Sequence, residues 1–228
     1  MTKTSILIAL LCSQQPQSSP PIAIVNLNVI PMDSARVLAG QTVLVSGDRI
    51  VRIGATRDVQ LPSGVRTIDG TGKYLIPGLV DTHVHLHANP ENEQRDLLKL
   101  FLAQGVTTIV NLRGNPQILG LRDAVRAGAV LGPRFYTVGP YVNEPFVTTP
   151  DQVDSAVTDE RRAGYDVVKL HGNLSRAAYA RLLTTGRREG IRIIGHAPRN
   201  LGVEAMFAGA GGHVSTRSRT WKSFCTTR

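Results

Sequence analysis

Apolar and polar residues are arranged in two different ways along this chain, and the pattern changes near residue 76. Before that point, short β-branched runs are separated by turn residues, which is typical of strands in a small sheet. The segment Ser46-Gly47-Asp48 lies between two such runs and predicts a hairpin turn, because glycine tolerates a positive φ. The predicted strands cover residues 22–30, 42–46, 49–53 and 66–69.

Beyond Pro77, apolar strand-like runs alternate with helical patterns. A glycine stands where each predicted helix ends, the position that favours a left-handed residue. This alternation predicts parallel strands joined by right-handed crossovers. The predicted strands are 79–85, 106–112, 134–138, 166–170 and 191–195, and the helices are 93–104, 117–127, 150–163, 175–189 and 201–208.

Five strand-helix units are fewer than a closed barrel requires. The chain has 228 residues, whereas a (β/α)₈ barrel takes about 250 before any further domain is added. We therefore expect an α/β fold with a partial (β/α)₈ TIM-like barrel of five units, spanning residues 76–210.

The net charge of +9 would favour an anionic partner if the basic residues formed one surface. Four of them, Arg217, Arg219, Lys222 and Arg228, instead lie in the last dozen positions. The remaining basic residues form no stripe and are not interleaved with aromatic residues. We expect no nucleic-acid partner. Residues 211–228 resemble a sequence read out of frame.

The N-terminal segment 1–21 has the outline of an export signal: a lysine, a short apolar run and a polar Ser/Gln/Pro stretch. This apolar run is too short to span a bilayer, so no stable membrane span is expected. Leu11 before Cys12 disfavours lipidation, because a small residue is wanted there. We expect a periplasmic or secreted protein, and a cytoplasmic protein with a frayed extension is the alternative. Cys12 and Cys225 support neither a disulfide framework nor a zinc site.

Two imidazoles at the end of the first barrel strand are the strongest candidates for chemistry. His83 and His85 are two residues apart, so in a strand they share a face and can bind one metal ion. A local hydrogen bond between them is the alternative. Lys169 and His196 stand at or near the ends of the fourth and fifth strands, and barrel active sites lie at that rim. For Lys169, extension to solvent is the alternative.

The run from Tyr74 to His85, with Pro77-Gly78 and Asp81, resembles the amidohydrolase superfamily when Lys169 and His196 are considered with it. Within it, the imidazolonepropionase-like and Xaa-Pro dipeptidase-like branch is the most similar. The resemblance implies that residues 22–75 form half of a small β-sandwich domain.

The resemblance also implies a metal centre. Two divalent ions, expected to be Zn²⁺, would be held by His83, His85, His196 and Lys169, the last as a CO₂-derived carbamate. The family's catalytic aspartate from the eighth strand has no counterpart in this chain, so the catalytic residue stays unknown.

Four further residues have weaker claims. His171 could contact substrate, and Arg113 is expected to form a salt bridge rather than to clamp substrate. His87 receives no role. His213 is not assigned as a ligand, because no β-rich run precedes it.

The resemblance implies a metal-dependent hydrolase, either an amidohydrolase or a dipeptidase, that cleaves C–N bonds with a metal-activated water. Its substrate would be a small amide, cyclic amide or peptide. A homo-oligomer is compatible with the sequence. The alternative is an inactive remnant of such an enzyme, without catalysis.

Overall fold

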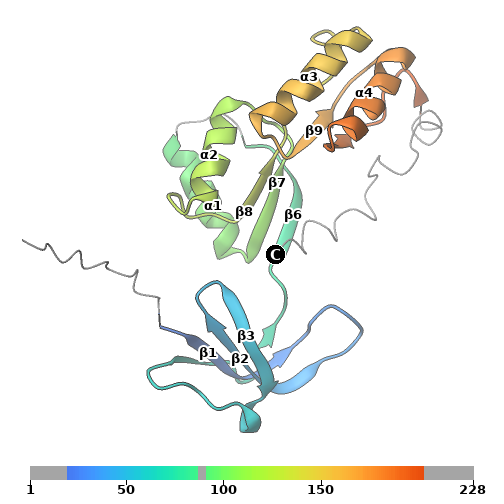
Figure 1. Ribbon diagram of the computed structural model, residues 1–228. Coiled ribbons are helices and arrows are strands. Elements are labelled where there is room, and N and C mark those ends of the chain that lie inside the picture. Colours follow the sequence, from blue (N-terminus) through green and yellow to red (C-terminus); the bar gives the residue numbers. More distant parts are fainter. Residues whose placement is uncertain (1–19, 87–90, 203–228) are drawn as a thin grey trace, which may run out of the picture. The chain divides into compact units, whose positions relative to one another are not determined.

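The computed structural model describes residues 20–86 and 91–202. It divides the chain into two compact units, Met1–Pro77 and Gly78–Arg228 (Figure 1). The predicted export segment, His87, the fifth helix beyond residue 202, His213 and the C-terminal tail lie outside the described residues, so the predictions about them stay predictions. In the described ranges, no helix combines the length and apolar character needed to cross a membrane.

The first unit is a five-stranded sheet with strand order β3-β2-β1-β4, and β5 also pairs with β1. Strands β1, β2 and β3 pair antiparallel, whereas β4 and β5 run parallel to β1. Gly47, with φ +58°, forms the predicted turn between β2 and β3. The strands are β1 Ile22–Val29, β2 Leu38–Ser46, β3 Arg49–Ala55, β4 Arg66–Asp69 and β5 Tyr74–Leu75.

One row of apolar residues crosses this sheet. Ile53, Val43, Ile24 and Ile68 are partners in register on four adjacent strands. Val43 in the middle is 1% exposed, but Ile53 and Ile68 at the two edges are 46% and 41% exposed. This row is thus buried at its centre and exposed at its edges, and the half-sandwich stays a prediction.

The second unit contains five parallel strands in two sheets, β6-β7-β8 and β9-β10. A single bridge between Val138 and Val167 joins them. This arrangement confirms the partial barrel. The strands are β6 Leu79–Val84, β7 Val106–Asn111, β8 Arg134–Thr137, β9 Val167–Leu170 and β10 Arg192–Gly195, and the helices are α1 Glu91–Ala103, α2 Pro116–Arg126, α3 Pro150–Ala163 and α4 Arg176–Arg188.

Helix ends follow the local sequence signals. Thr149 and Gln152 form a reciprocal capping box at the start of α3, and Pro150 occupies its first turn. Gly164 ends α3 in the left-handed conformation, with φ 90°. Ser175 caps α4 by accepting the Ala178 N–H. These signals explain why the predicted and observed helix bounds differ by no more than two residues.

Side chains on the strands alternate between two apolar layers. On β6, β7 and β8, Val84, Ile109 and Phe135 pack in a cluster with residues of α1 and α2. Val110, on the opposite face of β7, packs with Val138, Val167 and Ile194. We call this second group the inner cluster, because the helices contribute no residue to it.

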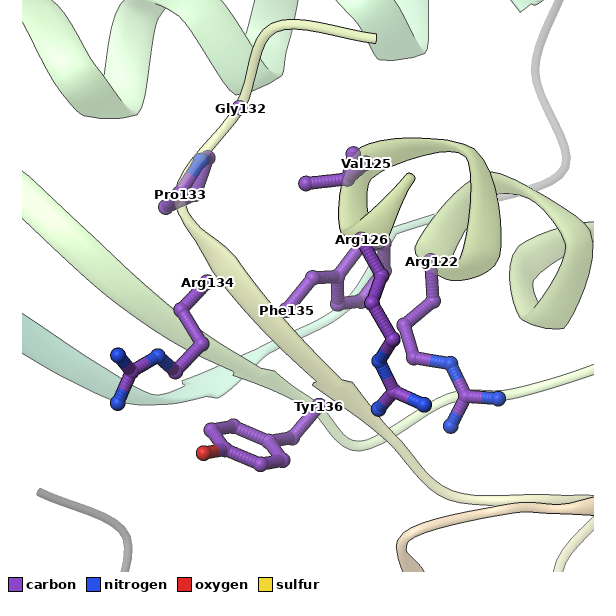
Figure 2. Close-up of a pocket in the computed structure, with 8 residues that line it drawn as sticks. All are labelled: Arg122, Val125, Arg126, Gly132, Pro133, Arg134, Phe135 and Tyr136. Carbon is purple, nitrogen blue, oxygen red and sulfur yellow. The ribbon is translucent and has the colours of Figure 1, made fainter. Parts of the chain in front are cut away.

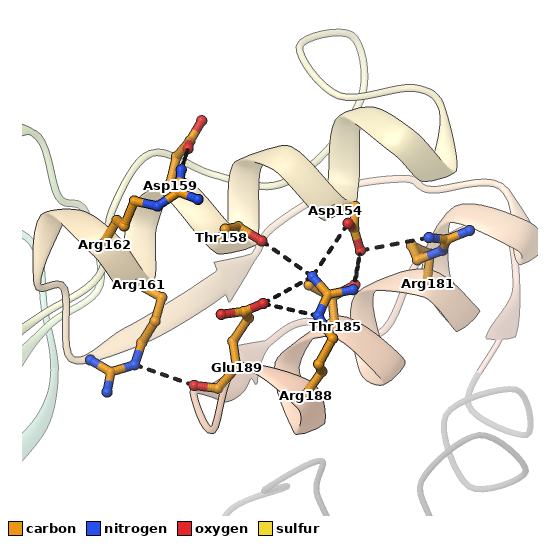
Figure 3. Close-up of polar contacts among 9 residues, drawn as sticks. All are labelled: Asp154, Thr158, Asp159, Arg161, Arg162, Arg181, Thr185, Arg188 and Glu189. Atoms are coloured by element: carbon orange, nitrogen blue, oxygen red, sulfur yellow. Dashed lines mark hydrogen bonds and ion pairs between the residues drawn. The ribbon is translucent and has the colours of Figure 1, made fainter.

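A polar network fastens α3 to α4 on their outer side (Figure 3). The Arg188 guanidinium donates to both carboxylate oxygens of Asp154, at 3.1 and 3.3 Å, and also reaches Thr158. Thr185 donates to the same Asp154 carboxylate. Hydrogen bonds from the Thr185 hydroxyl and the Arg188 guanidinium hold the pKa of Asp154 below its usual value. This network orients the two helices that cover β9 and β10.

Glu160 on α3 is a buried acid. Its side chain is 6% exposed and accepts the backbone N–H of Gly139, while Oε2 has no hydrogen-bond partner among the described residues. A Cβ atom at position 139 would lie 2.4 Å from the Glu160 Cδ, so a larger residue there would require the Glu160 side chain to move. Burial raises the pKa of Glu160 to about 8. The carboxyl is therefore neutral near pH 6.

Glu160 makes the stability of the fold depend on pH. The unfolded chain releases this proton near the ordinary pKa of 4.5, and the folded chain releases it near 8. The contribution of Glu160 to the free energy of unfolding is therefore complete below pH 4.5. It falls by about 1.4 kcal/mol per pH unit as pH rises from 4.5 to 8, and it is lost above pH 8. Glu160→Gln should flatten this decline in urea unfolding between pH 5 and 9. The exposed Glu93→Gln control should retain it, and an unchanged slope in Glu160→Gln would contradict the assignment.

Candidate metal centre

Two histidines lie on one side at the end of strand β6, His83 within the strand and His85 directly after it. Along residues 83–86 the side chains alternate: His83 and His85 are exposed, whereas Val84 and Leu86 are buried in the cluster with α1 and α2. The two imidazoles therefore face away from those helices. Asp81 fixes the start of this segment by accepting the His83 N–H at 3.0 Å.

The separation of the two rings fits a metal ion. The Nε2 atoms of His83 and His85 lie 3.2 Å apart. Two nitrogens at about 2.0–2.1 Å from one tetrahedral zinc ion would be separated by about 3.3 Å. A hydrogen bond between the rings, with one nitrogen protonated, would give a similar distance. The separation thus fits both a shared metal ion and a hydrogen bond between the two rings.

Lys169 lies on β9 and is 1% exposed. It is two residues beyond Val167 of the inner cluster, so the strand period places both on the same face. The alternative in which Lys169 extends to solvent is therefore wrong. Burial lowers the pKa of its amine, which favours the neutral, nucleophilic form.

His196 follows β10 directly. Its backbone N–H donates to the Leu170 carbonyl at 3.0 Å, which attaches it to the end of β9. Gly195 makes this possible: its φ is +132°, and a Cβ atom there would lie 1.9 Å from the same carbonyl oxygen. The His196 ring meets the His171 ring edge to face, with centroids 5.0 Å apart. His171 in turn stacks on Tyr141 at 4.6 Å.

Electrostatics connect the two groups of histidines. Burial first, and then the positive charges of His196, Lys169, Arg199 and His85, hold the pKa of His171 below its ordinary value. The charge of His85, directly after β6, therefore affects the same His171 ring as the charges of Lys169 on β9 and His196 after β10. Still, within residues 20–86 and 91–202 no three His, Cys, Asp or Glu side chains lie close enough to form a metal site. The four-residue ligand set remains a prediction.

Sequence reasoning overlooked Tyr141. It lies in the loop after β8, at the rim where barrel enzymes carry functional side chains, and that position was the available signal. Burial raises the pKa of Tyr141, and the positive charge of Arg113 opposes this. Arg113 thus lies near the aromatic stack of Tyr141 and His171, both of which are partly buried.

Comparison with known proteins agrees with this arrangement. Residues 74–218, more than half of the chain, match the Amidohydrolase family. The chain belongs to this family. The match includes β6 with its two histidines, Lys169 and His196.

Three similar proteins illustrate the family. The adenine deaminase of Staphylothermus marinus is 29% identical over 114 residues, which are 46% of this chain and 19% of that protein. A candidate prolidase from Bifidobacterium longum has a similar structure, with a TM-score of 0.73, 25% identity, and coverage of 83% of this chain and 52% of the other. A Xaa-Pro dipeptidase with bound methionine gives a TM-score of 0.68, 18% identity, and coverage of 83% and 59%. This amidohydrolase chain thus spans about half the length of these structures and less of the deaminase.

Asn111 fixes the backbone beside the histidine pair of this amidohydrolase. Its side chain is fully buried, and its Oδ1 accepts the N–H of Leu86, the residue after His85, at 2.7 Å. Its Nδ2 donates to the Arg113 carbonyl at 2.7 Å and to the Thr137 hydroxyl at 3.1 Å. One amide therefore connects the ends of β6, β7 and β8.

Removing this amide should be costly. Asn111→Ala removes the acceptor of the Leu86 N–H in the interior, and we expect a loss of about 2–3 kcal/mol in urea unfolding. Asn115→Ala is the matched control, because it removes only the cap of α2, at a cost of about 1 kcal/mol. Equal losses in the two variants would contradict the bridging role of Asn111.

Proposed function

We propose that this chain carries the metal-binding part of a hydrolase that cleaves C–N bonds in small amides, cyclic amides or peptides. The observation that carries the proposal is the 3.2 Å separation between the Nε2 atoms of His83 and His85. Family membership and the buried Lys169, whose pKa is lowered by burial, support it. Both the adenine deaminase and the Xaa-Pro dipeptidase bear names that imply breaking a C–N bond.

The ligands divide between the two sheets in this proposal. His83 and His85 would hold one divalent ion, His196 would hold a second, and Lys169 would lie between them as a carbamate. When bound, such ions lower the pKa of water and polarise a carbonyl group. Zinc is the expected element, because imidazole nitrogen suits it.

Burial lowers the pKa of Lys169, and this favours the amine form that can become a carbamate. Its amine nitrogen attacks the carbon of CO₂, a new N–C bond forms, and one amine proton is released. The product has two carboxylate oxygens and a negative charge, whereas an ammonium group would repel cations. Burial of Lys169 favours the unprotonated amine that this step requires.

His171 and Tyr141 would shape the substrate side of the site. Their stacked rings lie beside His196, and this packing restricts how both rings can move. His171 could thus contact the substrate amide directly, while Arg113 and Arg199 add positive charge to the same rim.

A second candidate is a remnant without catalysis. It is favoured by the absence, within the part of the chain that the structure describes, of three His, Cys, Asp or Glu side chains grouped for a metal. Such a protein would keep the His83–His85 pair but bind metal weakly or not at all.

Metal analysis separates the two candidates. The hydrolase predicts about two zinc ions per purified chain, as in two-metal sites. His83→Ala should weaken zinc binding more than tenfold, since even indirect partners of ligands account for about 10–100-fold. His213→Ala serves as the matched control and should bind zinc as the parent does. Absence of zinc after loading, together with no hydrolysis of amide substrates, would establish the remnant.

The carbamate has a test of its own that does not depend on activity. Zinc-loaded protein supplied with ¹³C-labelled bicarbonate should show one carbamate carbon resonance. Lys169→Met, which keeps the length and apolar stem of the side chain, should lose that resonance. Exposed Lys99→Met is the control and should retain it. A resonance that persists in Lys169→Met would place the modification elsewhere.

A further inference from the structure

A cavity of about 390 Å³ lies between the carboxyl-terminal part of α2 and strand β8 (Figure 2). Three of its lining residues are arginines, Arg122, Arg126 and Arg134, and none is acidic. Tyr136 and the apolar side chains of Val125 and Phe135 also line the cavity. The cavity thus combines positively charged and apolar side chains.

This cavity is distinct from the candidate metal centre. Arg134 is the first residue of β8, and Arg126 is the last residue of α2. His83, by contrast, lies near the carboxyl end of β6. Because β6, β7 and β8 are parallel, these two places are at opposite ends of the same sheet.

Arg122 provides a fixed positive charge. It is 3% exposed, and its guanidinium donates to Asp166 at 2.8 Å, to the Gly164 carbonyl at 2.9 Å and to Asp123 at 2.9 Å. The Asp166 carboxylate is also occupied by the Thr137 N–H at 2.9 Å. These bonds hold Arg122 in one orientation at the cavity wall.

Arg126 and Arg134 keep most of their donors available. Arg126 is exposed and reaches Asp166 only at 3.4 Å. Arg134 is also exposed, and it makes no ion pair with any other residue in the described ranges. Figure 2 shows the Arg126 guanidinium on the α2 side of strand β8, and the Arg134 guanidinium with the Tyr136 ring on the other side of that strand. The charge of Arg122 is largely balanced by Asp166 and Asp123, and that of the other two is not.

We propose that this cavity binds a small organic phosphate. Arg126 would contact the phosphate from the α2 side of β8 and Arg134 from the other side, while the apolar side chains contact the organic group. The guanidinium fork matches phosphate oxygens in pairs, and a dianion can neutralise two guanidinium groups. The volume is within the range of about 300–1,000 Å³ that is usual for small-molecule sites. The macrodipole of α2 places about half a negative elementary charge at its carboxyl end, which repels an anion but is smaller than the charge of the two guanidinium groups.

The test is a calorimetric titration of the full chain, after treatment with a chelator, with phenyl phosphate as the probe. Metal-free protein keeps the result independent of the proposed hydrolase. We expect saturable binding that weakens at least about tenfold in Arg126→Ala and in Arg134→Ala, since charge-assisted hydrogen bonds contribute about 1.5–3 kcal/mol. Inorganic phosphate should bind the same site more weakly, because it lacks the apolar contact.

Two controls separate a site from general surface charge. Arg162→Ala removes an equally exposed arginine on α3, and it should bind phenyl phosphate as the parent does. Sodium chloride at matched ionic strength should compete only weakly. Equal weakening in all three arginine variants, or no saturation up to about 10 mM phenyl phosphate, would overturn the proposal.

Discussion

The carboxylate of Asp166 joins the two halves of the barrel sheet. Only one backbone bridge connects β8 to β9, and Asp166 lies next to it. Its side chain accepts the Thr137 N–H from β8 and the Arg122 guanidinium from α2, while its own N–H donates to the Thr137 carbonyl. Since the histidine pair is on one sheet and Lys169 with His196 on the other, the candidate metal centre depends on this junction.

The apolar interior of the barrel changes the properties of Lys169 and of the histidines at the strand ends. Val110, Val138, Val167 and Ile194 form an apolar surface on the inner face. An amine on that surface loses hydration and with it part of its affinity for a proton, as Lys169 shows. Histidines at the strand ends remain exposed enough to receive a ligand. A rim of histidines and an apolar floor are thus consequences of one strand period.

Much of this architecture could be predicted from the sequence, because strand and helix periods are local. Residues 150–163 were predicted as a helix with the observed bounds, and the His83–His85 pair was expected on one face. The split between β8 and β9 was not predicted, since it depends on pairing between distant segments. Nor were the roles of Asn111 and Glu160, because their burial is decided by tertiary packing. An isolated Asn or Glu gives no local sign of it.

The contact between Gly139 and Glu160 has a consequence for how this family can vary. Position 139 begins the loop that carries Tyr141 to the rim, while Glu160 belongs to a helix on the outside of the barrel. A side chain at 139 would displace the Glu160 carboxyl, and its backbone N–H would then lose this acceptor. Among descendants of this chain, substitutions at the two positions should therefore be coupled, so the outer helix restricts the evolution of the loop that carries Tyr141.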